Sequence, residues 1–242
     1  MIARSPVAHS VLDRALATID AVHAADGPTS VGAIAVHTGL PTSTVSRMVA
    51  ELVEQRYLRR SGSAVVLGTR LFELGMRASM PKRLRAAVAP VMRRISDETG
   101  ERVVMWVRQD AHMVLVAAVP GRLPAMPTQV GMRASALTTA SGKACLAFTA
   151  ADVVADLSRP LPLRGAARLR DELDEVRVTT IAVDAGVAFP GIHAVASPIL
   201  SARAEVIGAL SLAMPAGAMD AERLAPLLRE ASASVSQRLT AA

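Results

Sequence analysis

The segment from Leu40 to Leu52 constrains the fold more than any other part of the chain. It follows Gly39, which suits a tight turn, and Pro41 suits the first position of a helix. Apolar residues then recur at helical spacing and form one buried stripe: Val45, Met48, Val49, Leu52 and Val53. The residues left facing outward are Thr42, Ser43, Thr44, Ser46 and Arg47. The pattern therefore predicts an amphipathic helix with a polar N-terminal face.

That polar face suits contact with the major groove of DNA. Hydroxyl groups and the free N–H groups of a helix N-terminus can hold phosphates. An arginine can bond either a guanine edge or a phosphate, which is the role we expect for Arg47. The sequence therefore predicts a recognition helix.

Two further helices are expected upstream of it. The apolar spacing over residues 10–25 predicts the first, which Gly27-Pro28 ends. The second should begin at Ser30, whose hydroxyl can cap it, and end at Gly39. Three helices in this order are typical of a helix-turn-helix domain.

A short hairpin is expected after the recognition helix. Residues 57–60 and 64–67 read as two strands around a turn at residues 61–63. The hairpin would be a wing, with Arg59 and Arg60 placed to contact phosphates. A small packed domain, with Ser and Thr acting only as caps, is the alternative. The joint occurrence of three helices, turn and basic hairpin favours DNA binding.

Composition and charge restrict the class of protein. The chain has 242 residues, 51% of them hydrophobic, which is enough for two domain cores. Its net charge of +6 favours an acidic partner such as DNA. The single cysteine, Cys145, excludes an internal disulfide and a cysteine-based zinc site, and we expect no metal and no cofactor. Charged residues interrupt the N-terminal apolar stretch, so we expect no membrane span and a cytoplasmic location.

A domain boundary is predicted near residue 80. Residues 69–79 have the spacing of an amphipathic helix that ends before Pro81. We therefore divide the chain into a winged helix-turn-helix domain (1–68), a linker helix (69–80) and a second domain (81–242). The expected order of elements in the second domain is helix, strands, helix, loop, helix, strands, helix, with a first strand pair at 103–107 and 113–119. This order predicts an α+β fold on an antiparallel sheet.

A possible anion site lies in the second domain. Ser141-Gly142-Lys143 should start a helix that runs to about Phe148. Free backbone N–H groups at such a start can receive a carboxylate. An ordinary helix cap explains the same residues, and spacing alone does not decide between the two.

Several motifs together resemble the IclR family of bacterial regulators, over nearly the whole chain. In the first domain the resemblance is carried by Gly39-Leu40-Pro41, residues 43–47, Tyr57-Leu58 and Leu67-Gly68. In the second it is carried by residues 139–144, Val183-Asp184, residues 190–192, 196–198 and 208–211. The resemblance implies a winged helix-turn-helix joined to a GAF-like effector-binding domain. It also implies a homodimer or tetramer that binds an operator and more often represses than activates.

The resemblance further implies an effector pocket. Its residues here would be Met126, Ala140, Ser141, Gly142, Asp184, Ile192, Ala194 and Ser211. Ala194 stands where the family often has a cysteine, and Ala213 where a second serine often follows. With these two polar contacts missing, we expect a carboxylic acid less polar than a two- or three-carbon keto acid. Further candidates for the walls, or for the core alone, are Met105, Trp106, Met113 and Met132.

Two other functions remain as alternatives. Cys145, His193 and Asp184 are the residue types of a thiol hydrolase, but Cys145 lies inside an apolar predicted helix, where a buried thiol is inert. We therefore expect no enzyme activity. The replaced pocket residues also leave open a DNA-binding assembly protein whose C-terminal domain senses nothing.

Overall fold

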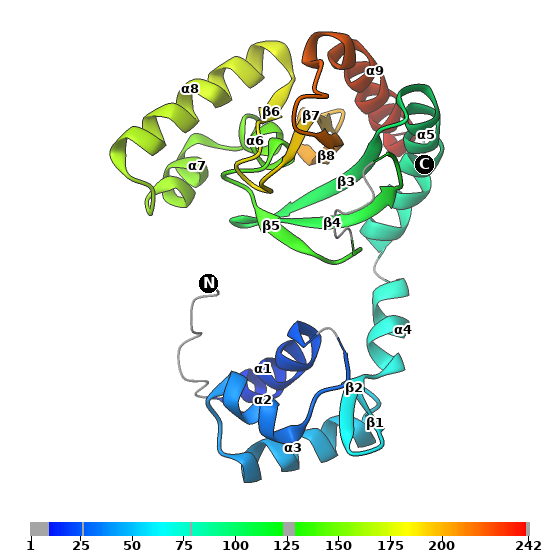
Figure 1. The fold of residues 1–242 in the computed structure, drawn as a ribbon, viewed down its shortest axis with the longest axis vertical. Coiled ribbons are helices and arrows are strands. Elements are labelled where there is room, and N and C mark those ends of the chain that lie inside the picture. Colours follow the sequence, from blue (N-terminus) through cyan, green and yellow to red (C-terminus); the bar gives the residue numbers. More distant parts are fainter. Residues whose placement is uncertain (1–9, 26, 78, 123–128, 241–242) are drawn as a thin grey trace. The chain divides into compact units, whose positions relative to one another are not determined.

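The chain forms two compact units, Met1–Ser79 and Met80–Ala242, each with its own core (Figure 1). The computed structural model describes residues 10–25, 27–77, 79–122 and 129–240. None of the helices in these stretches is long and apolar enough to cross a membrane.

The first unit is a winged helix-turn-helix, as the sequence predicts. Its elements are α1 (Val11–Ala24), α2 (Val31–Thr38), α3 (Thr42–Glu54), β1 (Leu58–Ser61), β2 (Ala64–Leu67) and α4 (Thr69–Arg77). The predicted cap is confirmed, since Ser30 Oγ accepts a hydrogen bond from the Ala33 N–H. Gly39 ends α2 in the left-handed conformation, with φ of 71°, which only glycine adopts without strain. The turn between α2 and α3 is therefore fixed by local chemistry.

The second unit has an α+β fold, which confirms the predicted class. Its elements are α5 (Ser79–Thr99), β3 (Arg102–Gln109), β4 (His112–Val119), β5 (Arg133–Ser135), α6 (Ala140–Leu146), α7 (Ala151–Ser158), α8 (Leu163–Thr179), β6 (Ala182–Asp184), β7 (Ile192–Leu200), β8 (Val206–Pro215) and α9 (Ala221–Thr240). The strands form one sheet in the order β5-β4-β3-β8-β7-β6, and each neighbouring pair is antiparallel.

Helices cover both faces of this sheet (Figure 1). Successive side chains of a strand point to opposite faces, and in this sheet both sets are apolar and need cover. Val103 and Met105 of β3 pack with α5 and α9, whereas Val104 and Trp106 pack with α6, α7 and α8. Each face thus has its own apolar core. The second face is the one on which the predicted pocket residues lie.

Three features of the second unit differ from the sequence prediction. The strand β5 was not expected, and the region between α6 and β6 holds two helices, α7 and α8, instead of one. We expected a helix boundary at Pro81, yet the backbone of Pro81 lies in the first turn of α5. Proline is tolerated there because the first N–H groups of a helix have no acceptor within the helix.

Candidate DNA-binding surface and effector pocket

The N-terminal turn of α3 is open to a ligand. Pro41 precedes the helix and makes no side-chain cap, so the first N–H groups keep their capacity to donate. Val45, Met48 and Val49 are buried on the opposite face. Among the predicted contact residues of this helix, Thr44 is half-buried. The other four are exposed: Thr42, Ser43, Ser46 and Arg47. Four of the five predicted side chains on this helix therefore share an exposed surface.

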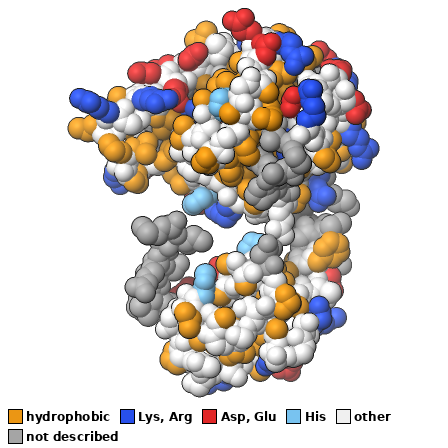
Figure 2. Space-filling view, viewed as in Figure 1, with side chains coloured by type: hydrophobic (Ala, Val, Ile, Leu, Met, Phe, Trp, Pro, Cys, Tyr) orange, Lys and Arg blue, Asp and Glu red, His pale blue; other side chains and the backbone are white. Residues whose placement is uncertain are grey.

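The wing is the hairpin of β1 and β2. Arg59 lies opposite Val66 and Arg60 opposite Val65, with Gly62 at the turn in the left-handed conformation. Both arginines are exposed, and arginine side chains (blue) appear along the edge of this unit near β1, β2 and α4 (Figure 2). Val65 also bridges to Thr29, with hydrogen bonds of 3.0 and 2.7 Å, and this anchors the wing to the segment before α2.

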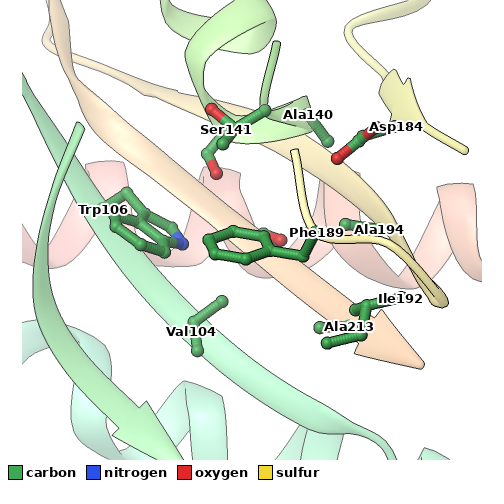
Figure 3. Close-up of a pocket in the computed structure, with 11 residues that line it drawn as sticks. Val104, Trp106, Ala140, Ser141, Asp184, Phe189, Ile192, Ala194 and Ala213 are labelled. Atoms are coloured by element: carbon green, nitrogen blue, oxygen red, sulfur yellow. The ribbon is translucent and has the colours of Figure 1, made fainter. Parts of the chain in front are cut away.

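The strand register brings the predicted pocket residues together. Asp184 of β6 lies opposite Ala194 of β7, and Ala194 lies opposite Ala213 of β8. Ser211 lies opposite Val104 of β3 in the neighbouring row. The start of α6 closes the space above these rows (Figure 3).

Of the eight predicted ligand-binding residues, six line one cavity: Ala140, Ser141, Asp184, Ile192, Ala194 and Ser211. Met126 lies outside the described residues. Gly142 does not line the cavity, and its Cα faces the carbonyl group of Ala136 instead. Among the further candidates, Trp106 is a wall, whereas Met105 and Met113 are fully buried in the two cores.

Four lining residues were not named among the predicted ligand contacts or candidate walls: Val104, Thr139, Phe189 and Ala213. In the sequence, Ala213 stands out only as a departure from the family pattern. Val104 and Trp106 share a strand face, so alternation along β3 could have paired them. Phe189 comes from the loop between β6 and β7, where no periodicity exists to indicate its direction.

The polar groups of the cavity are not all available to a ligand. Thr139 caps α6, since its hydroxyl accepts from the Gly142 N–H at 3.1 Å and donates to the Ser135 carbonyl at 2.8 Å. Asp184 accepts from the N–H groups of Val187 at 2.8 Å and Ala188 at 3.2 Å, so its carboxylate shapes the loop that follows.

Two backbone donors and two hydroxyl groups of the cavity remain. In the described parts of the chain, the N–H groups of Ala140 and Ser141 meet no acceptor. Ser141 and Ser211 are almost completely buried, and their hydroxyls make no hydrogen bond with a described residue. The rest of the lining is apolar, so the cavity offers donors on one side and hydrocarbon or aromatic surface on the other.

An ion pair holds α6 against α8. Lys143 Nζ donates to Glu172 Oε2 at 2.8 Å, and Arg168 Nε donates to Oε1 of the same carboxylate at 2.8 Å. Burial raises the pKa of Glu172, but the bonds from Lys143 and Arg168 outweigh it and leave that pKa below its ordinary value. The side chains of Lys143 and Glu172 are largely shielded from water. Their ion pair stabilises the position of α6, the helix whose start lines the cavity.

Glu172→Gln is expected to lower the free energy of unfolding at pH 7 by about 1–2 kcal/mol, because charge-assisted hydrogen bonds are lost. A carboxyl with a depressed pKa stabilises the fold above its unfolded pKa and stops doing so as pH falls through the folded value. The difference between wild type and variant should therefore vanish at acid pH. Urea unfolding across this range measures it, with Glu175→Gln on the exposed side of α8 as the control. A pH-independent difference would contradict the ion-pair explanation.

Cys145 is a structural residue. It is completely buried in α6, and this burial raises the pKa of its thiol to about 12. A nucleophilic cysteine needs a lowered pKa and access to substrate, and this one has neither. Among the described residues, no group of three His, Cys, Asp or Glu side chains could hold a metal ion.

The fold and the two surfaces define a DNA-binding regulator with a separate ligand-binding domain. Residues 11–62 match the IclR helix-turn-helix domain, and residues 78–237 match the bacterial transcriptional regulator IclR C-terminal domain. The chain belongs to the IclR family of bacterial transcriptional regulators, which are not enzymes.

Curated relatives agree with this assignment. The chain is 29% identical to the probable transcriptional regulator SauR of Cupriavidus necator, over 87% of this chain and 88% of SauR. It is 24% identical to the acetate operon repressor of Salmonella typhimurium, over 89% of this chain and 84% of the repressor.

Solved structures share the fold. An IclR homolog of Microbacterium hydrocarbonoxydans, crystallised with 4-hydroxybenzoate, superposes with a TM-score of 0.88 at 26% identity, over 96% of this chain and 100% of the other. An IclR transcriptional regulator of Alicyclobacillus acidocaldarius gives a TM-score of 0.80 at 22% identity, over 94% and 98% of the two chains.

Proposed function

We propose that this protein is a transcriptional repressor whose binding to an operator is controlled by a small carboxylic acid. The observation that carries the DNA-binding part is the uncapped start of α3, which presents Thr42, Ser43, Ser46 and Arg47 to solvent. Free N–H groups and hydroxyls there would hold phosphates, and Arg47 would reach a base edge. Arg59 and Arg60 on the wing would contact the backbone of the same site.

The effector would bind in the cavity between α6 and the sheet. A carboxylate would accept from the Ala140 and Ser141 N–H groups and from the hydroxyls of Ser141 and Ser211. Ala194, Ala213, Trp106 and the other apolar walls would contact an apolar body. This lining favours an aromatic or longer aliphatic acid over a two- or three-carbon keto acid. The 4-hydroxybenzoate bound by the Microbacterium homolog is an acid of this kind.

Control of DNA binding would come through the assembly. A homodimer would offer two copies of α3 to half-sites of a pseudo-palindromic operator, and a tetramer would offer four. An effector that binds one subunit arrangement better than another shifts the population between them. Only arrangements whose α3 spacing matches the operator would bind tightly, so the acid would change operator affinity without touching DNA.

Retention of the upstream intergenic DNA of its own gene tests this function. We expect specific retention that weakens between two salt concentrations, because phosphate contacts release counterions. One acid from a panel of aromatic, aliphatic and keto acids should alter that retention, and the same acid should raise the melting temperature by mass action. Absence of specific retention under every condition would refute the proposal. Specific retention with no responding acid would favour the assembly protein that senses nothing.

A further inference from the structure

The ring of Phe189 lies inside the effector cavity. Phe189 belongs to the loop between β6 and β7, and its ring points across the cavity toward Trp106, with Ala194 and Val104 nearby (Figure 3). The space that remains is about 20 Å³, enough for about one water molecule. The cavity in this form therefore has no room for an effector with an aromatic ring.

Hydrogen bonds hold the loop that carries this ring. The Asp184 carboxylate accepts from two N–H groups of the loop, and the Ile192 N–H donates to the Phe189 carbonyl at 3.0 Å. Phe189 itself is only half-buried, and its neighbours Pro190 and Gly191 are exposed. Departure of the ring from the cavity would thus need only a side-chain rotation or a local loop change, and the pairing of β6 with β7 would stay as it is.

The volume of the cavity determines which ligands could enter after such a movement. An apolar cavity of about 150 Å³ accepts a benzene molecule and a cavity for one water does not. Removal of the phenyl ring of Phe189 frees the volume of one such ring beside the free donors of Ala140 and Ser141. The freed space and the donors together match a carboxylate attached to one aromatic ring.

We propose that the Phe189 ring occupies the place that the effector's ring takes, and that the effector binds by displacing it. This inference rests on the proposed effector-binding function and deepens it. Phe189 is then the specificity-determining residue, because an acid that can replace its ring recovers the lost apolar contacts with Trp106. A two- or three-carbon acid displaces the ring without recovering them and binds weakly.

The affinity for benzoate of wild type and Phe189→Ala tests this directly. Trp106 is the only tryptophan of the chain and lines the cavity, so its fluorescence reports occupancy of the site. The displacement cost falls on the wild type alone, and a closed state that leaves about 1–10% of the molecules open weakens binding by about ten- to a hundredfold. Phe189→Ala should therefore bind benzoate tighter by about that factor. Pyruvate should bind it weakly.

Two further variants serve as controls, one for the position of the ring and one for folding. Phe148 packs at the edge of the core on this face of the sheet and does not line the cavity. Phe148→Ala also removes a phenyl ring, and it should leave benzoate affinity unchanged. Phe189→Leu keeps a smaller apolar side chain and should fold even if Phe189→Ala does not. Its affinity for benzoate should lie between those of the wild type and Phe189→Ala.

Equal or weaker benzoate binding by both Phe189 variants would overturn the inference, since the ring would then be a wall that contacts the ligand. Failure of wild type and both variants to bind benzoate would overturn it as well. In either case the proposed function is judged separately, by whether another acid alters operator retention by the wild type. The two failures are therefore distinguishable.

Discussion

Arg47→Ala is expected to weaken specific operator binding by about 1–3 kcal/mol, or about five- to 150-fold in the dissociation constant. The arginine is exposed on the first turns of α3, opposite the buried stripe, so its removal deletes a contact to DNA without opening the core. The loss should be concentrated on the operator because a base-edge contact discriminates between sequences. Fluorescence anisotropy with operator and scrambled duplexes of equal length measures both affinities.

Two comparisons make this result interpretable. Arg203→Ala removes an exposed arginine in the turn between β7 and β8, and it should leave operator affinity and melting temperature unchanged. Arg60→Ala on the wing should weaken binding to operator and scrambled DNA alike and reduce the salt slope by about one. If Arg47→Ala left the operator footprint and affinity unaltered, α3 would not be the recognition helix.

Gly142→Ala is expected to destabilise the second unit strongly. A Cβ added to Gly142 would lie 2.1 Å from the carbonyl oxygen of Ala136, and backbone atoms cannot move aside as a flexible side chain can. Overpacking of this kind costs about 1–3 kcal/mol or more. Gly142 is thus required for the close approach of α6 to the preceding chain, and its effect on the pocket is indirect. Urea unfolding followed by far-UV circular dichroism measures the loss.

Gly165→Ala is the matched control, because it makes the same chemical change in another helix. A Cβ at Gly165 in α8 meets its nearest atoms at 3.7 and 3.8 Å, which are ordinary contacts. This variant should be as stable as wild type or gain about 0.4–1 kcal/mol through the lower entropy of its unfolded chain. Equal effects of the two substitutions would show that the close approach at Gly142 is unimportant.

The first unit could be predicted closely because local chemistry determines it. Ser30 caps α2, Gly39 ends it, and the apolar stripe of α3 has an unambiguous helical period. These signals act within a few residues and need no knowledge of distant contacts. Only Thr44 of the predicted α3 surface is more buried than the pattern indicates.

The second unit was predicted less completely, since its details depend on long-range packing. The three-residue strand β5 is too short for its alternation to be recognised, and it pairs with β4 on the side away from β3. The resemblance to relatives indicated six lining residues of the pocket, but no local pattern indicates that a loop turns Phe189 into it. The sequence also predicts Gly142 as a ligand contact, because its close packing against Ala136 depends on long-range structure that no sequence pattern indicates.

The central claim is that one chain couples an acid-binding pocket to operator binding, and the most direct test measures that coupling from both sides. Operator affinity is measured with and without saturating acid, and acid affinity with and without saturating operator. Linkage requires the two ratios to be equal, and typical coupling factors are about 5–150-fold. We predict equal ratios in this range. Operator affinity that is identical with and without a bound acid would contradict the claim and identify the second unit as an assembly domain.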